Sequence, residues 1–298
     1  MRLTLLFLTL LTITPWASWS ADATTPSNPS LLQQATEAML TDLDLAEKYI
    51  KQALVSAPDN PEVHFICGRI MGQQAENAIF SALSYAKKSL TCLEQAVSMQ
   101  PENTGYRRGL MSFYLGAPGI AGGDEDLAWQ QVEQITKLNA LQGALAKLNF
   151  YRQTEQQDQY RQLLEQSRIS YPGLAEFHYR HGLLLQEQKQ FSQAFSAFVA
   201  ATKAADDDAG VYVFNAWYQI GRTALFSQQQ LADGTHALQY FIAHAPDSDD
   251  VPEKVWAHLR LAQLHKLNND IALMQQHLDY ASQSNDKELQ REIRRLQR

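Results

Sequence analysis

The segment from Phe177 to Thr202, FHYRHGLLLQEQKQFSQAFSAFVAAT, constrains the fold more than any other part of the sequence. Small and large residues recur in it at spacings of three, one and four, at His178, His181, Gly182, Leu185, Ala194, Phe198 and Ala201. Ten residues separate Pro172 from Gly182, and ten also separate Pro58 from Gly68. A fixed step that recurs in this way indicates an array of repeated units.

The spacing resembles the tetratricopeptide repeat, which has W-x2-L-G-x2-Y on a first helix and A-x3-F on a second. Histidines take the two large positions in the segment above, and Trp217-x2-Ile220-Gly221 is the best match to the first helix. The resemblance covers about residues 31 to 283, in six to seven repeats. It implies an all-α protein, a TPR α-solenoid in which antiparallel helix pairs stack into a right-handed superhelix.

Three segments depart from the regular repeat. About nine extra residues separate the two helices of the second repeat, and residues 117–124 form a Gly- and Pro-rich insertion in the third. We expect both to be enlarged turns on one edge of the array, with Asp124 as the N-cap of the helix that follows. The charged, amphipathic residues 284–298 are expected to form a capping helix over the last repeat.

Glycine recurs at one position of the first helix, at Gly68, Gly109, Gly182 and Gly221. A glycine inside a helix costs about 1 kcal/mol relative to alanine. The recurrence therefore predicts that two helices approach closely there. We expect the glycines to face the small residues of the second helices, Ala46, Ala128 and Ala194.

The N-terminus has the features of a signal peptide. A basic end, an apolar run from Leu3 to Ile13, Pro15 and then small residues predict a signal peptide over residues 1–23. Residues 24–30 are interpreted as a flexible lead-in, and an uncleaved membrane anchor is the alternative. No other apolar stretch is long enough to cross a membrane, so we expect no transmembrane segment in the mature chain. The absence of an N-x-S/T sequon favours export to the periplasm of a Gram-negative bacterium.

The first helices are expected to line a concave groove. Positions counted from the glycines are mainly aromatic, arginine or asparagine residues: Phe65, Arg69, Tyr106, Tyr114, Asn149, Arg152, Tyr179, Asn215, Tyr218 and Arg222. Tyrosine and arginine are common in binding hot spots because they combine large contact area with directional hydrogen bonds. The groove is therefore a candidate site for a peptide or extended segment, with acidic or C-terminal carboxylate groups as its expected preference. The alternative is that some of these rings belong to the core.

The predicted function is a non-catalytic scaffold that binds a protein or peptide segment, in envelope assembly as one hypothesis. The alternative is a carrier of a small ligand or lipid, whose apolar pore is lined by rings such as Phe113, Tyr114 and Phe226. A net charge of -7 disfavours nucleic acid as a partner. We find no catalytic constellation and no zinc-ligand spacing among the histidines, so we expect no enzyme activity, cofactor or metal site.

The two cysteines of the chain are candidates for a disulfide. Cys67 and Cys92 are expected on the facing helices of the second repeat. An exported protein meets an oxidising environment, in which such a bridge persists. Two buried free thiols are the alternative.

Overall fold

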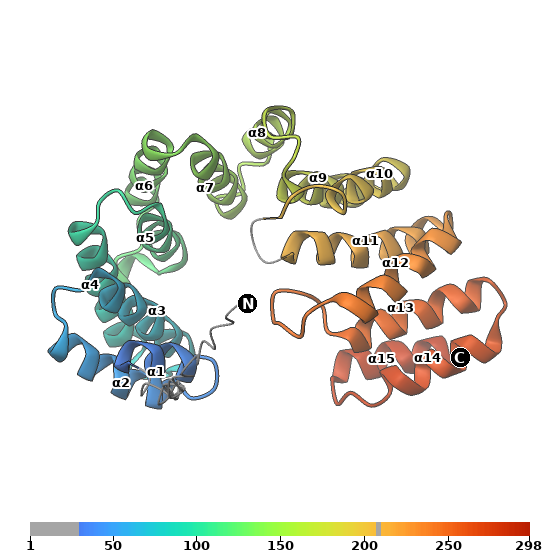
Figure 1. Cartoon of the computed structure of the whole chain (residues 1–298), viewed down its shortest axis with the longest axis horizontal. Coiled ribbons are helices and arrows are strands. Elements are labelled where there is room, and N and C mark those ends of the chain that lie inside the picture. Colours follow the sequence, from blue (N-terminus) through green and yellow to red (C-terminus); the bar gives the residue numbers. More distant parts are fainter. Residues whose placement is uncertain (1–29, 207–209) are drawn as a thin grey trace, which may run out of the picture. The chain divides into compact units, whose positions relative to one another are not determined.

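The protein is described here by a computed structural model of residues 30–206 and 210–298. The predicted signal peptide and residues 24–29 of the lead-in lie outside the described residues. The regular elements of the described part are fifteen α-helices and one short 3-10 helix, with no β-strand (Figure 1). The all-α prediction is therefore confirmed. The chain divides into an N-terminal unit, Met1–Met99, and a C-terminal unit, Gln100–Arg298, which are described separately.

The N-terminal unit consists of two helix pairs packed on one core. The helices are α1 (Leu31–Ala38), α2 (Leu43–Ser56), α3 (Pro61–Asn77) and α4 (Ala82–Met99). Apolar residues at helical spacing, such as Ala46, Ile50 and Ala53 on α2, are at most 3% exposed. Between the helices, Glu47 accepts hydrogen bonds from Gln74 and from the Tyr85 hydroxyl, at 3.3 and 3.0 Å. These bonds satisfy a carboxylate that is only 8% exposed.

The extra residues of the second repeat lengthen its helices instead of forming a large turn. α3 and α4 contain 17 and 18 residues, and only residues 78–81 connect them. The expectation of an enlarged turn here is therefore wrong. No proline lies between Pro61 and the end of α4 at Met99, so the helical hydrogen bonds continue through the added residues.

The C-terminal unit continues the alternation of first and second helices. Its helices are α5 (Thr104–Gly116), α6 (Glu125–Leu138), α7 (Ala140–Gln153), α8 (Gln157–Ser170), α9 (Ala175–Glu187), α10 (Phe191–Ala201), α11 (Val211–Ser227), α12 (Leu231–His244), α13 (Lys254–Leu267), α14 (Ile271–Ala281) and α15 (Lys287–Leu296). These helices form five pairs from α5/α6 to α13/α14, and successive pairs contact each other at all four junctions. α15 buries Leu289 and Ile293 in a cluster with residues of α13 and α14. Within the described residues, no helix is both long and apolar enough to span a bilayer.

A proline turn repeats before three of the first helices. The carbonyl oxygens of Pro58 and Pro172 each lie 2.7 Å from Nε2 of the histidine six residues later, His64 and His178. In the third repeat, Arg107 Nε donates to the Pro101 carbonyl at 2.5 Å. His64 and His178 both occupy the Trp position of the consensus, and each closes the turn before its helix. This role accounts for them without a metal or a catalytic function.

The recurrent glycines admit the large side chain of the facing helix. A Cβ on Gly68 would lie 2.5 Å from Leu93 Cγ, and one on Gly221 would lie 2.3 Å from Leu238 Cγ. On Gly182 it would meet the Phe198 ring at 2.5 Å. The predicted close approach is confirmed at Gly68, Gly182 and Gly221. The expected partner is wrong, because the large residue of A-x3-F, four residues beyond the small one, occupies the space that the absent Cβ leaves.

The insertion in the third repeat forms a turn between α5 and α6, as predicted. Residues Gly119–Ala121 form a 3-10 turn, and Gly122 follows with a φ of 103°, which favours glycine. A Cβ on Gly123 would lie 1.7 Å from the Ala117 carbonyl oxygen, so only glycine fits there. The Asp124 carboxylate accepts a hydrogen bond from Leu127 N at 2.9 Å, which confirms Asp124 as the N-cap of α6.

Candidate functional site

The candidate groove residues fall into both units of the chain. Phe65 and Arg69 lie on α3 of the N-terminal unit, where Phe65 packs on the core and Arg69 is exposed. The other eight lie on α5, α7, α9 and α11 of the C-terminal unit. We call the surface formed by α5, α7, α9, α11 and α13 the first-helix face, and the site is built on it.

Two of the candidate tyrosines are core residues. Tyr114 and Tyr218 are each 6% exposed. Tyr114 packs edge-on against Phe113, with ring centroids 6.3 Å apart, and Tyr218 packs against Phe241 at 5.5 Å. Their rings therefore stabilise the helix packing and offer little area to a ligand.

One cavity of about 100 Å³ lies on the first-helix face, and we call it the central cavity. Its lining comes from several first helices: Arg108 on α5, Gln142, Leu145 and Asn149 on α7, Ala175, Glu176 and Arg180 on α9, and Tyr212 on α11, with Leu174, Ala205 and Asp206 from the connections. Arg108 Nη1 donates to Gln142 Oε1 at 3.4 Å, which joins two neighbouring first helices. Of the candidate residues predicted from the sequence, Asn149 lines this cavity.

Arg180 is the most constrained charge in the central cavity. It is 8% exposed, its Nε donates to Glu176 Oε1 at 2.7 Å, and its Nη2 donates to Asn149 Oδ1 at 3.0 Å. Burial alone would lower the pKa of Arg180. The Glu176 carboxylate, with Tyr160 and Tyr212, outweighs burial and raises the pKa above its ordinary value. The guanidinium therefore stays charged and orients the Asn149 amide.

Tyr179 lies close to this cavity. Its ring is 5.8 Å from that of Tyr212 and 5.9 Å from that of Phe198. Burial raises the pKa of Tyr179, although a hydrogen bond with Gln219 partly opposes the rise. The hydroxyl is thus neutral at ordinary pH and acts through hydrogen bonds. Tyr106 is also half-buried, on α5, and Arg152 is exposed near the end of α7.

A second cavity, of about 500 Å³, lies on α11 and α13, and we call it the arginine cavity. Its lining residues are Tyr218, Arg222, Ser248, Asp249, Val251, Pro252, Glu253, Trp256, Arg260 and Glu288. Burial lowers the pKa of Arg222; Tyr218 opposes this, and the neighbouring Arg260 adds to it. The cavity thus contains two guanidinium groups that repel each other.

Asn215 has a structural role beside the arginine cavity. Its Nδ2 donates to the carbonyl oxygen of Val211 at 2.9 Å and to that of Asp250 at 2.8 Å. The second bond ties α11 to the connection before α13, which carries part of the cavity lining. Asn215 therefore positions the cavity wall.

Among the lining residues that sequence counting did not identify are Arg180, Tyr212, Trp256 and Arg260. Arg180 and Arg260 each lie two residues before the glycine position of the repeat. That earlier position was not among those expected to line the groove. Trp256 lies six residues before the glycine position, and applying the same count to every repeat would have found it. Tyr212 lies at the start of α11, beyond the consensus, and carries no such signal.

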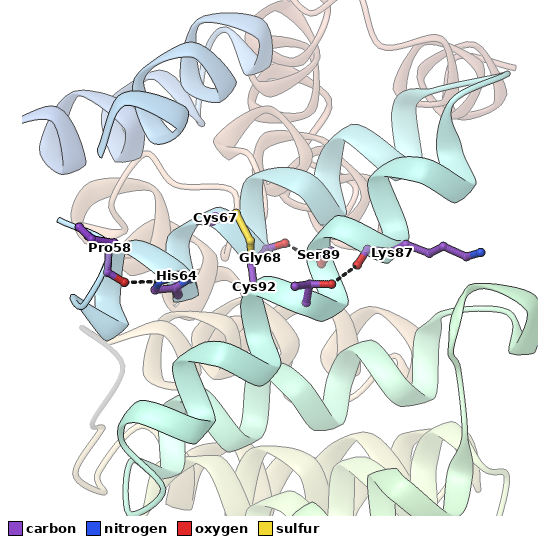
Figure 2. The surroundings of a disulfide bond; sticks show 8 residues. Pro58, His64, Cys67, Gly68, Lys87, Ser89 and Cys92 are labelled. Carbon is purple, nitrogen blue, oxygen red and sulfur yellow. Dashed lines mark hydrogen bonds between the residues drawn. A yellow bond between two sulfur atoms is a disulfide. The ribbon is translucent and has the colours of Figure 1, made fainter. Parts of the chain in front are cut away.

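Cys67 and Cys92 form a disulfide between α3 and α4, with their Cα atoms 5.9 Å apart (Figure 2). Beside it, the Ser89 hydroxyl donates to the Gly68 carbonyl at 2.7 Å. The bridge, this hydrogen bond and the proline turn of Pro58 and His64 all lie at the same helix pair (Figure 2). The disulfide and the Ser89 hydrogen bond fix α3 against α4, and the Pro58–His64 contact closes the turn before α3.

Three histidines lie in a row on α13 and α14. His258 Nδ1 is 3.0 Å from His277 Nδ1, and the His277 ring stacks on His265 with centroids 5.4 Å apart. Burial, together with His258 and His265, lowers the pKa of His277 to about 4. Among the described residues, no group of three or more histidine, cysteine or acidic side chains is placed to hold a metal ion.

No family model matches the chain, and no curated protein matches its sequence. Among solved structures it resembles Cut9 from the APC/C hetero-tetramer Cut9–Hcn1, with a TM-score of 0.56 and 12% identity over 90% of this chain and 48% of that one. Yeast Tom70 matches with a TM-score of 0.55 and 12% identity, over 93% of this chain and 65% of that one. The human IFIT1 dimer with PPP-AAAA matches with a TM-score of 0.50 and 16% identity, over 81% and 55%.

The chain thus spans about half to two thirds of the length of these structures. At such identities the likeness concerns the fold. The matched structures are of the tetratricopeptide repeat type, and the helix pairs, the glycine contacts and the repeated proline turns of this chain agree with them. The protein therefore has the helical solenoid fold of the tetratricopeptide repeat proteins.

Proposed function

We propose that the protein is a non-catalytic scaffold that binds an extended segment of a partner protein on the first-helix face of residues 100–298. The observation that carries the proposal is the central cavity, because side chains from α5, α7, α9 and α11 meet in it. A segment that crosses four successive first helices contacts one side chain after another. This arrangement suits an extended chain better than a compact small molecule.

The chemistry of the central cavity fits a peptide backbone. Arg180 holds the Oδ1 atom of Asn149, which leaves the Nδ2 group of this amide to donate to a carbonyl. The Gln142 amide and the Arg108 guanidinium lie in the same cavity. Side-chain amides both donate and accept, so they bind backbone groups whatever the side chains of the segment are. Tyr179 and the exposed Arg152 extend the proposed surface.

We further propose that the protein is exported, with the periplasm as its compartment and the cell envelope as the source of its partner. Residues 1–23 support this through their signal-peptide pattern. The Cys67–Cys92 disulfide is consistent with it, since such bonds persist in oxidising compartments. The net charge of -7 favours a protein partner over a nucleic acid.

Site-specific photocrosslinking tests the proposed surface. A photoreactive phenylalanine analogue replaces Arg108 or Arg152 on the first helices, and matched variants carry it at Glu133 on α6 or Arg161 on α8, which are exposed second-helix positions. We expect one protein of the envelope fraction to crosslink from Arg108 and Arg152 and not from the other two. Adducts only from Glu133 and Arg161 would move the contact to the second helices. If no position gives a protein adduct, native mass spectrometry for a co-purified ligand would test the carrier alternative.

A further inference from the structure

The arginine cavity contains two cations that the described part of the chain leaves without an ion pair. Arg222 on α11 and Arg260 on α13 line the same cavity, and neither forms a salt bridge with any described carboxylate. They are close enough for Arg260 to lower the pKa of Arg222. Two like charges beside one cavity of a protein with a net charge of -7 mark a place where an external anion would relieve repulsion.

Both guanidinium groups are held in the same way by their own helices. Arg222 Nη1 donates to Gln219, three residues away, and its group lies 5.3 Å from the Phe226 ring centroid. Arg260 Nη1 donates to Gln263, also three residues away, and its group lies 5.5 Å from the Trp256 ring centroid. A neutral amide and an aromatic ring orient each guanidinium and leave its charge uncompensated.

One buried donor of each side chain remains without an acceptor. The Nε atoms of Arg222 and Arg260 are both buried and have no hydrogen-bond partner within the described residues. Buried N–H groups of this kind are rare in folded proteins, so the two guanidinium groups are less satisfied than arginine side chains ordinarily are. Arginine presents its donors in a planar fork that matches the two oxygens of a carboxylate.

Acidic residues of the cavity do not occupy these donors. Asp249, Glu253 and Glu288 also line it, but all three are exposed. The charged and polar groups that shift the pKa of Arg222 are Tyr218, Arg260 and Tyr179, and no carboxylate is among them. The arginine side of the cavity is therefore available to a carboxylate that comes from outside.

We propose that Arg222 and Arg260 form a carboxylate-binding subsite for an acidic side chain of the bound segment. In this arrangement Trp256 contacts an apolar residue of the segment next to the acidic one. The identity of the occupant as a protein segment rests on the proposed function. The chemistry of the subsite does not, because it depends only on the two guanidinium groups and the cavity that they share.

The experiment measures arginine Nε–H signals by NMR while short peptides are added to the mature protein. The probes are acetyl-Gly-Val-Asp-Val-Gly-amide, its Asn isostere, the Asn peptide with a free C-terminal carboxylate, and inorganic phosphate. We expect the Asp peptide to shift the signals of Arg222 and Arg260 and to bind at least about ten-fold more tightly than its isostere, since hydrogen bonds to charged groups are the stronger ones. Arg222→Gln and Arg260→Gln should each remove this preference.

Two controls separate binding from folding and from net charge. Arg161→Gln on α8 makes the same change in charge outside the cavity and should leave the preference intact. Arg222→Lys keeps the charge but not the planar fork, so an intermediate preference is expected if the fork matters. Far-UV circular dichroism checks that each variant is folded, and a variant that is not folded is replaced by the corresponding lysine variant.

The outcomes distinguish this inference from the proposed function. Equal binding of the Asp and Asn peptides would overturn the subsite, even if crosslinking through Arg108 and Arg152 succeeds. Preference only for the peptide with a free C-terminus would keep the carboxylate site and make the chain terminus its source. Phosphate binding as tight as that of the Asp peptide would overturn the carboxylate assignment. A carboxylate preference without any protein crosslink would retain the subsite and refute the scaffold.

Discussion

Gly68→Ala tests the packing argument most directly, because Gly72 on the same helix provides a matched control. A Cβ on Gly68 would lie 2.5 Å from Leu93 Cγ and 2.6 Å from its Cδ2. On Gly72, one turn later, the nearest atom is Ser89 Oγ at 3.5 Å, an ordinary contact. Both glycines face α4, and both would gain the same helix propensity from alanine, so the difference between them isolates the steric effect.

The expected magnitudes follow from these contacts. Alanine in place of glycine stabilises a helix interior by about 1 kcal/mol. At Gly72 this gain should appear almost in full. At Gly68 the Leu93 side chain, which is 5% exposed, would have to retreat by about 0.9 Å to reach the 3.4 Å at which ordinary contact begins. Overpacking of this kind costs about 1–3 kcal/mol. The upper part of that range applies here because the branch atom Cγ of Leu93 must move, and the gain in helix propensity of about 1 kcal/mol offsets part of the cost. We therefore expect Gly68→Ala to destabilise by about 1–2 kcal/mol.

Helix separation cannot easily relieve the clash at Gly68. The neighbouring residues Cys67 and Cys92 join α3 to α4 covalently, and Ser89 Oγ hydrogen-bonds to the Gly68 carbonyl. Reduction of the disulfide should accordingly lessen the cost of Gly68→Ala, because the helices then have more freedom to move apart.

Hydrogen exchange of α3 and α4 peptides under increasing urea is the suitable measurement, because repeat arrays need not unfold in one step. It reports the opening free energy of the helix pair itself. We expect Gly72→Ala to raise this energy and Gly68→Ala to lower it. If Gly68→Ala proves as stable as Gly72→Ala, the glycine is not required by close packing and the reasoning fails.

Three further predictions concern single interactions. Replacing Cys67 and Cys92 by serine should lower the stability of the N-terminal unit by about 3 kcal/mol, measured by urea unfolding; two thiols labelled in the unfolded, unreduced wild type would contradict the bridge. His277 has a folded pKa of about 4 against an ordinary 6.5. The unfolded chain therefore takes up a proton first, and stability should fall between pH 6.5 and pH 4, by about 1–2 kcal/mol after a discount for solvent screening. His277→Gln should flatten this dependence in thermal unfolding, and an unchanged slope would assign it to other groups. Glu176→Gln leaves the Arg180 charge buried without its partner and should cost about 3 kcal/mol; a loss below 1 kcal/mol in thermal unfolding would mean that Asn149 and solvent suffice.

The repeat fold could be predicted because its signals are local. The glycine, the small and large residues and the proline lie at fixed steps along one or two helices, and helical geometry converts these steps into faces. The N-cap at Asp124 and the turn from Ala117 are equally local, and both were predicted correctly. The side chains that contact the glycines were not predicted correctly. Which side chain fills the space beside a glycine depends on how far one helix is shifted along the next.

The candidate site could be predicted only in part, for a related reason. Position in the repeat identifies Arg222 and Asn149 as first-helix residues, and both line cavities. Repeat position could not predict that the Tyr218 ring packs against Phe241 in the core. An aromatic side chain at the edge of a helix face can pack into the core or lie on the surface.

The amino-acid sequence was sufficient to predict that the chain forms successive helix pairs, where each pair starts, and which helices supply the small residues. Spacing along one chain carries that information, because backbone hydrogen bonds and side-chain faces are set within a few residues. The tertiary structure was needed to show that Arg180 on α9 orients Asn149 on α7, and that Arg222 and Arg260 share a cavity in which neither pairs with a described carboxylate. Those relations depend on which side chains from separate helices meet at low exposure, and burial and charge compensation are properties of that packing.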